Sequence, residues 1–162
     1  MNVFSDHQSK VLKKLLGELI NQQKAETIIP AKKPEPGFWF GGGKLVKDQN
    51  GTIWLSGRYR NAGDSRTGLE VGVRGAVCAI FRSDDGGMHF DKVGSWTKAE
   101  LSTVDQEVIS IEGTALHCQS DIRWELFIST EIRVQYPDDV RDYQKPGTGV
   151  WHIDRMVANS PD

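Results

Sequence analysis

The stretch that decides the fold is Ser110-Ile111-Glu112-Gly113-Thr114-Ala115-Leu116, followed after a polar turn by Trp124-Glu125-Leu126-Phe127-Ile128-Ser129-Thr130-Glu131. An acid, Glu112, stands directly before a glycine at the start of the first apolar run. The second run ends in another acid, Glu131. Two short apolar runs separated by a turn predict a pair of β-strands.

The same arrangement occurs 70 residues earlier in the chain. There the run 42–46 leads through a polar turn at 48–51 into the run 52–58. At this single offset Gly43 corresponds to Gly113, and Trp54 corresponds to Trp124. An internal repeat built only of strands favours the blades of a β-propeller, where chemistry is concentrated at the mouth of the central channel.

The composition is that of one ordinary domain. The chain has 162 residues, of which 38% are hydrophobic and 17 are glycine, so it can bury a core and has many turns. Its formal charge of −2 gives no support to a nucleic-acid or membrane-surface partner. The N-terminus has no signal-peptide pattern, so we expect a cytoplasmic protein if Met1 is the natural start.

The cysteines and histidines give no indication of a disulfide framework or a metal site. Cys78 and Cys118 lie in or beside strand patterns, and we interpret both as buried thiols. The four histidines do not have the spacing of metal ligands. A phosphate-binding loop is also absent from the sequence, so we predict neither a metal nor a cofactor.

The chain divides into two parts. Residues 1–37 contain a predicted helix at 6–23, where apolar residues recur at a spacing of about four, and a proline-rich linker. Residues 38–162 are predicted to be all-β, with one blade at 38–97 and a second, incomplete blade at 108–162. The predicted strands are 43–47, 52–60, 75–82 and 89–96 in the first blade, and 112–117, 123–130 and 149–155 in the second.

Two blades cannot close a ring, because a propeller has at least four. We therefore expect a fragment, a split gene product or half of an oligomeric ring, with five blades in the whole propeller or, as a second choice, six. Such a piece is expected to self-associate through its open blade edges. The alternative is a compact two-sheet protein that only looks like blades.

A turn motif supports the propeller. The segment Ser83-Asp84-Asp85-Gly86-Gly87-Met88-His89-Phe90 has the spacing Ser-x-Asp-x-Gly-x-x-Phe and resembles the Asp-box of sialidases and related propellers. In such a turn Ser83 and Asp85 hydrogen-bond to backbone amides, Gly87 adopts a positive φ, and Phe90 anchors the next strand. The resemblance implies a structural role, and the alternative is an ordinary Asp-Gly hairpin.

Glu112 is the main catalytic candidate. The pair Glu112-Gly113 resembles the acid–glycine motif that carries the general acid in five-bladed glycosidases of the arabinanase and xylosidase type. This resemblance implies hydrolysis of a glycosidic bond, in which one carboxylic acid protonates the leaving oxygen and a second carboxylate activates water or attacks carbon. That family opens earlier blades with aspartate motifs, whereas Gly42-Gly43 stands at the equivalent place here. The alternative is that Glu112 caps a strand or pairs with an arginine.

The loop after the second predicted strand is expected to share the mouth with Glu112. Guanidinium groups there can bind the carboxylate or phosphate of an acidic sugar. The predicted substrate-binding residues of this loop are Arg58, Arg60, Asn61 and Arg66. Asp64 and Glu131 are the candidates for the second carboxylate. The alternative is an exposed loop held by salt bridges.

The long loop after Glu131 occupies the matching position in the second repeat. Long loops on a rigid β-scaffold are often functional, and we predict that Tyr136 and Lys145 contribute to substrate binding. The favoured function is therefore a glycoside hydrolase-like propeller that acts on a carbohydrate. The alternatives are a non-catalytic carbohydrate-binding propeller and an inactive propeller fragment, and the missing acid at Gly42 separates the first reading from the other two.

Overall fold

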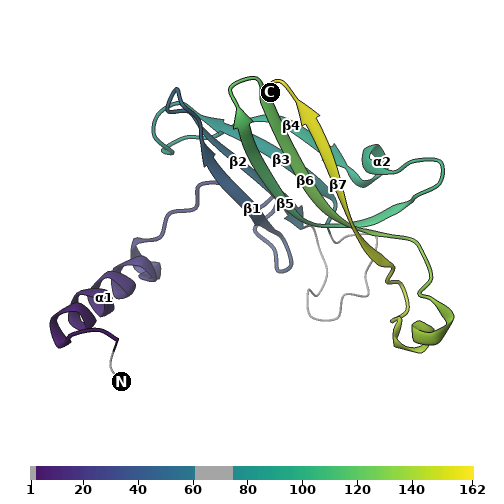
Figure 1. Ribbon diagram of the computed structural model, residues 1–162, viewed down its shortest axis with the longest axis horizontal. Helices are drawn as coiled ribbons and strands as arrows, with labels where there is room; N and C mark the ends of the chain where they lie inside the picture. Colours follow the sequence, from purple (N-terminus) through teal and green to yellow (C-terminus); the bar gives the residue numbers. More distant parts are fainter. Residues whose placement is uncertain (1–2, 61–74) are drawn as a thin grey trace.

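The computed structural model of this chain describes residues 3–60 and 75–162 (Figure 1). The described part is mostly β-strand and is preceded by one N-terminal helix, as predicted. The elements are α1 (Asp6–Leu19), η1 (Gln22–Lys24), β1 (Trp39–Lys47), β2 (Ile53–Arg60), β3 (Val77–Ser83), β4 (Asp91–Thr97), α2 (Lys98–Leu101), β5 (Val108–Ser120), β6 (Arg123–Ile132), η2 (Asp138–Tyr143) and β7 (Val150–Ala158).

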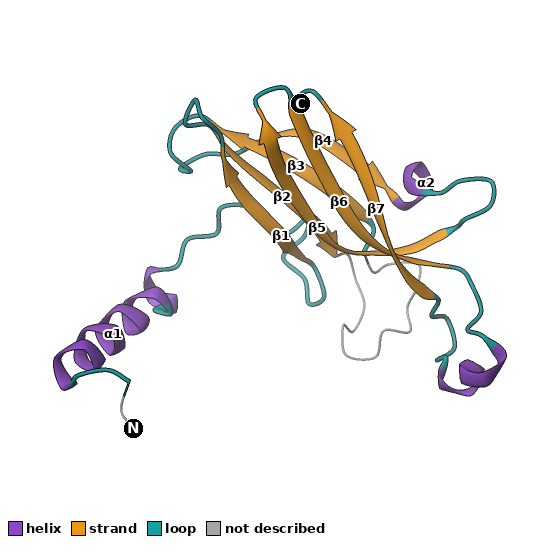
Figure 2. Cartoon of the chain, in the orientation of Figure 1, coloured by secondary structure: helices purple, strands orange, loops and turns teal. Residues whose placement is uncertain are grey.

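The strands form two antiparallel sheets (Figure 2). The first sheet has the order β1-β2-β3-β4 and the second has the order β5-β6-β7. Within each sheet every strand pairs with its neighbour in sequence. Short turns join β1 to β2, β3 to β4 and β5 to β6, whereas a long loop joins β6 to β7. The prediction of two antiparallel sheets is therefore confirmed.

The first strand of each sheet begins about four residues before its predicted start. The reason is an irregularity in pairing at the same place in both repeats. The register of β1 shifts between Gly41 and Lys44, and that of β5 shifts between Ile111 and Gly113. A bulge of this kind lets pairing continue past a glycine while the strand bends. The residues before each predicted start, 39–42 and 108–111, therefore also belong to the strands.

The two sheets pack face to face around one hydrophobic core. Alternate residues of β2, including Trp54, point toward the second sheet, which follows from the two-residue period of a strand. β5 lies against both β1 and β2. The buried core residues are Trp54, Cys78 and Ile80 from the first sheet and Val108, Ile111, Leu116, Trp124, Leu126, Ile128 and Ile132 from the second.

A smaller apolar cluster covers the outer face of the first sheet. Leu55, Ala79 and Phe81 lie on this face and are buried. Ile29, from the linker that precedes β1, is 7% exposed and packs onto them. The linker therefore covers one outer sheet face.

Helix α1 is shorter than predicted and ends at Leu19 rather than at residue 23. Its start is fixed by a capping box, in which Ser5 and Gln8 hydrogen-bond reciprocally. The helix stops because Asn21 accepts a hydrogen bond from the amide of Gln23 and starts the separate turn η1. None of its residues is buried, and the helix extends away from the sheets in Figure 1.

No helix in residues 3–60 and 75–162 is both long enough and apolar enough to cross a membrane. Both cysteines are free thiols: Cys78 is fully buried between the sheets and Cys118 is half-buried.

Candidate functional site

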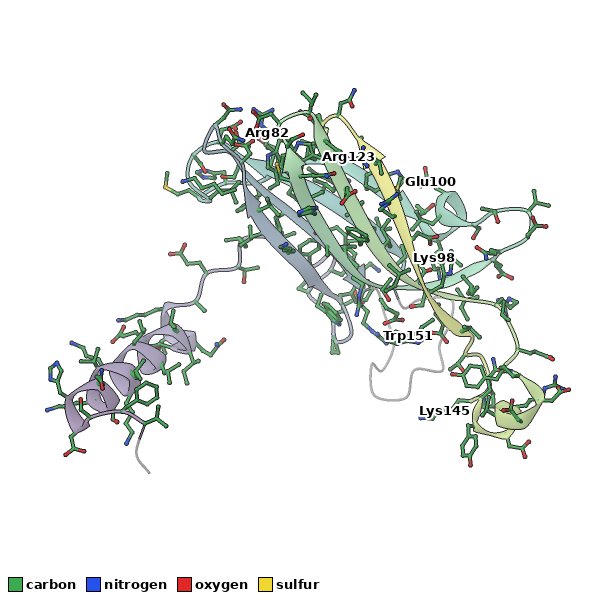
Figure 3. The ribbon with its side chains drawn as sticks, viewed as in Figure 1. Arg82, Lys98, Glu100, Arg123, Lys145 and Trp151 are labelled. Atoms are coloured by element: carbon green, nitrogen blue, oxygen red, sulfur yellow. The ribbon has the colours of Figure 1, made fainter. Side chains whose placement is uncertain are left out.

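The candidate site lies where β1 and β5 begin and β2 ends. Trp39, the first residue of β1, pairs with Arg60, the last residue of β2. The start of β5 lies beside these strands. The evidence is that a Cβ atom built on Gly42 would lie only 3.5 Å from the backbone carbonyl oxygen of Glu112. The opposite end of the sheets carries the turns before β2 and β4, near Arg82 in Figure 3.

Arg58 and Glu112 form a pair that joins the two sheets. The Nε of Arg58 donates a hydrogen bond to the backbone carbonyl of Glu112, and its Nη2 lies 3.6 Å from Oε2 of the same residue. The two side chains are only 11% and 13% exposed. The expectation that the end of β2 meets Glu112 agrees with this geometry, and so does the alternative that Glu112 pairs with an arginine.

Two further side chains hold this pair in place. The Oγ of Ser110 donates a hydrogen bond to Oε1 of Glu112 at 2.5 Å. The ring of Trp39 lies 4.7 Å from Cζ of Arg58, which is within the range of a cation–π contact. Burial lowers the pKa of the Arg58 guanidinium, the charge of Glu112 acts in the opposite direction, and the charge of Arg60 lowers it further.

The glycines at 42 and 43 are explained by close packing rather than by a lost acid. Gly42 has φ +66°, and a Cβ atom there would lie 3.2 Å from Nε of Arg58. A Cβ atom on Gly43 would lie 1.7 Å from the carbonyl oxygen of Ser56. A side chain at Gly42 would crowd the guanidinium of Arg58, and one at Gly43 would displace the backbone of β2 at Ser56.

Arg60 lies on the same side of β2 as Arg58 and is 6% exposed. Its Nε is buried and has no hydrogen-bond partner among the described residues. The other predicted residues of this loop, Asn61, Asp64 and Arg66, lie outside the described residues.

Glu131 on β6 pairs directly with Ser110 on β5 and with Trp151 on β7. The three residues therefore form one cross-strand row of the second sheet. Its side chain is 1% exposed, and its Oε1 accepts a hydrogen bond from the amide of Gly149 at 2.5 Å. Glu131 therefore positions the start of β7. As a second carboxylate it would first have to become accessible to water.

The long loop after β6 is held together by Gln144. Its side chain accepts a hydrogen bond from the amide of Tyr136 and donates to the carbonyls of Val134 and Thr148. Tyr136 is half-buried and Lys145 is exposed. In Figure 3, Lys145 lies on this loop away from the sheets, whereas Trp151 lies at the start of β7. A direct contact of Tyr136 or Lys145 with Glu112 is not seen in the described residues.

The segment that resembles an Asp-box connects β3 to β4, at the end of the sheets away from Glu112. Oδ1 of Asp85 accepts hydrogen bonds from the amides of Met88 and His89, and Oγ of Ser83 accepts one from the amide of Gly87. Gly87 has φ +96°, and Phe90 packs beneath the turn with the outer apolar cluster. These bonds organise the turn and place no reactive group near the candidate site.

The hollows in the described residues do not establish a concave site around Glu112. An apolar cavity of about 240 Å³ lies between the sheets, where Trp96, Trp124 and Met156 line it. A polar hollow of about 270 Å³ lies at the opposite end and is lined by Asp48, Arg82 and others. A concave substrate site at Glu112 stays a prediction.

Sequence reasoning missed Trp39 and Ser110 as parts of the site. Trp39 is the first residue of β1, and its ring covers Arg58. Ser110 stands two residues before Glu112, so the two side chains leave the strand on one side, and this spacing was the available signal.

Comparisons with known proteins add no relative. None of the family models, curated proteins or solved structures compared with this chain matches it.

Proposed function

We propose that this protein is a glycoside hydrolase-like member of the β-propeller glycosidases and that Glu112 is the general acid of its site. The observation that carries the proposal is the convergence of Glu112, Arg58 and Trp39 at one end of two stacked meanders. A carboxyl group, a cation and an aromatic ring at strand ends are the groups that bind a sugar and protonate its leaving oxygen. The two sheets correspond in this proposal to neighbouring blades, and the β3–β4 turn to an Asp-box.

The ion pair sets a condition on this mechanism. A neighbouring positive charge favours the ionised form of a carboxylate, whereas a general acid must carry a proton when it reacts. Arg58 therefore has to turn from the carboxylate of Glu112 toward the substrate before the proton is transferred. Its hydrogen bond to the backbone carbonyl of Glu112 can persist through this change.

The test uses Glu112→Gln with two aryl glycosides, one with a good leaving group and one with a poor leaving group. The amide keeps the shape of Glu112 and cannot donate a proton as an acid. We expect turnover of the poor leaving group to fall by about 10²–10⁴-fold, with a smaller loss for the good leaving group. An equal loss with both substrates contradicts the general-acid role. Ser129→Ala, a half-buried position on β6, is the matched control.

A second candidate function is carbohydrate binding without catalysis. The position of Glu131 favours it, because this carboxylate is buried and already accepts a hydrogen bond from the amide of Gly149. It is therefore not exposed to act as the second catalytic carboxylate. Binding of a sugar by the wild-type chain, with no turnover of any aryl glycoside, would support this second function over the first.

A further inference from the structure

The apolar cavity between the sheets lies at their more open edge. Strands β1 and β2 lie against β5, whereas the edge strands β4 and β7 approach each other less closely in the described residues. The cavity of about 240 Å³ is lined by Trp96 of β4, Trp124 of β6 and Met156 of β7, among others. Glu112 is not among the lining residues, so this cavity is separate from the proposed glycosidase site.

Small residues on the edge strands leave the space for this cavity. In the first sheet Gly94 pairs with Ile80, and in the second sheet Ala158 pairs with Trp124. In both pairs the large residue stands on an inner strand and the small one on an edge strand, so the close packing of the core stops at the edge. A Cβ atom on Gly94 would lie only 3.3 Å from the ring of Trp96. The glycine therefore gives this ring room to lie against the sheet as one wall of the cavity.

The size and lining of the cavity suit a flat apolar group. An apolar cavity of roughly 150 Å³ is enough to bind benzene, and the cavity between β4 and β7 is larger. Aromatic walls favour stacked or edge-on contacts with another ring, and the flexible thioether of Met156 can adapt to its shape. A bicyclic ring such as indole is therefore a suitable occupant.

The apolar cavity continues into the polar hollow of about 270 Å³ at the end of the sheets. The residues that line both are Trp124, Ser160, Pro161 and Asp162. Among the described residues, the charged side chains that line the polar hollow are three carboxylates and one guanidinium: Asp48, Asp121, Asp162 and Arg82. A ligand in the apolar cavity can therefore place a polar group among an excess of carboxylates.

The guanidinium of Arg82 is already paired. Its Nε lies 2.9 Å from Oδ2 of Asp84, and its Nη1 lies 3.4 Å from Oδ2 of Asp162. Arg123, which is also labelled near this end in Figure 3, lies 3.8 Å from Glu125 and does not line the hollow. The hollow therefore favours a positively charged group, which the carboxylates and the face of a tryptophan ring both attract.

We propose that this protein binds a small amphipathic amine, with its flat apolar body between β4 and β7 and its ammonium group in the polar hollow. Asp121 and Asp162 recognise the ammonium group, and Trp96, Trp124 and Met156 contact the apolar body. This site goes beyond the proposed function, because it shares no residue with the Arg58–Glu112 pair.

The test uses three probes that share an indole ring: tryptamine, which is a cation at neutral pH, indole-3-ethanol, which is neutral, and indole-3-acetate, which is an anion. Calorimetry measures their binding. We expect tryptamine to bind about tenfold or more tightly than indole-3-ethanol, with indole-3-acetate the weakest. The double variant Asp121→Asn/Asp162→Asn should lose this preference and still bind indole-3-ethanol. Asp105→Asn, in an exposed loop, is the control and should keep the preference. Equal affinity for the three probes, or tightest binding of indole-3-acetate, would overturn the proposal.

The methionine methyl groups give an independent readout of where the ring binds. Met156 lines the cavity, whereas Met88 is 72% exposed in the β3–β4 turn. In the protein with isotope-labelled methionine methyl groups, tryptamine should shift the NMR signal of Met156 and leave that of Met88 unchanged. An unchanged Met156 signal at saturating tryptamine would overturn the proposal. So would a Met156 signal that responds only to protein concentration, because a second copy of the chain would then cover the cavity.

Filling the cavity should weaken all three probes together. Ala158→Leu adds apolar volume on the inner face of β7, opposite Trp124. Ile153→Phe is the matched control, because Ile153 is 68% exposed on the outer face of the same strand. Unchanged binding in a folded Ala158→Leu protein would place the probes elsewhere and contradict the proposal.

Discussion

Trp54 and Trp124 contact each other across the two sheets, with ring centroids 5.6 Å apart and an interplanar angle of 59°. They are the residues that correspond at the 70-residue offset of the repeat. Both are almost fully buried, at 4% and 5% exposure. The equivalent residues of the two repeats thus form one contact that holds the sheets together.

Replacing Trp124 by alanine should therefore destabilise the fold strongly. Truncation of a buried tryptophan leaves a cavity and costs about 3–5 kcal/mol of unfolding free energy. Denaturant unfolding followed by circular dichroism measures this change. Trp151→Ala is the control, because Trp151 is 66% exposed and its truncation should have little effect. Similar losses in the two variants would contradict the proposed contribution of this contact.

Gly43→Ala should also lower stability, because the new Cβ atom would lie 1.7 Å from the carbonyl oxygen of Ser56. The strands must separate at the bulge to relieve this clash. Gly17→Ala is the matched control: nothing lies within 4 Å of its Cβ position in α1, and alanine favours the helix by roughly 1 kcal/mol over glycine. Thermal unfolding should show opposite shifts for the two substitutions. A tolerated alanine at position 43 would rule out the close packing described for β1.

Asp85 should make the stability of the fold depend on pH. The amide of His89, then the His89 side chain and Ser83, hold the pKa of Asp85 below its ordinary value of 3.8. A lowered folded-state pKa adds stability above the unfolded pKa, and this stability is lost as the pH falls below about 3.8. Asp85→Ala should therefore lower the unfolding midpoint at pH 6, and the difference from wild type should narrow toward pH 3. Asp105→Ala, in an exposed loop, should show no such narrowing.

The two thiols should react at very different rates. Burial raises the pKa of the Cys78 thiol to about 12, and Cys78 is fully buried. Burial, then the nearby Asp121 and Asp48, also raise the pKa of Cys118, which is half-buried. Alkylation near pH 8 followed by mass spectrometry should label Cys118 slowly and Cys78 only after unfolding. Rapid labelling of Cys78 in the native protein would mean that the sheets open readily.

Self-association is expected because apolar surface remains exposed on the second sheet. Trp151, Ile153 and Val157 point outward from β7 and are 66%, 68% and 48% exposed. Light scattering should show an average mass that rises with concentration, and Ile153→Lys should reduce it. Arg155→Lys on the same strand keeps the charge and serves as the control. A constant monomer mass over the whole concentration range would contradict this prediction.

Much of the fold follows from local sequence. The short apolar runs between polar turns predicted the seven strands found in residues 3–60 and 75–162, and the spacing of apolar residues predicted α1. The starts of β1 and β5 were placed too late, because a bulge continues a strand past a glycine and leaves no compositional signal. The number of blades in a closed ring stays a prediction.

The sequence by itself determined the strands, the repeat and the polar turn at Ser83–Phe90, because these depend on side-chain periodicity and on local hydrogen bonds. Only the tertiary structure decided that Arg58 contacts Glu112 and that the ring of Trp39 covers Arg58. It also decided that the carboxylate of Glu131 accepts a hydrogen bond from the amide of Gly149. Arg58 and Glu112 are 54 residues apart in the chain. Contacts over such separations depend on how the two sheets stack. The residues next to Arg58 or Glu112 in the sequence therefore do not show how deeply each side chain is buried or which residue it contacts.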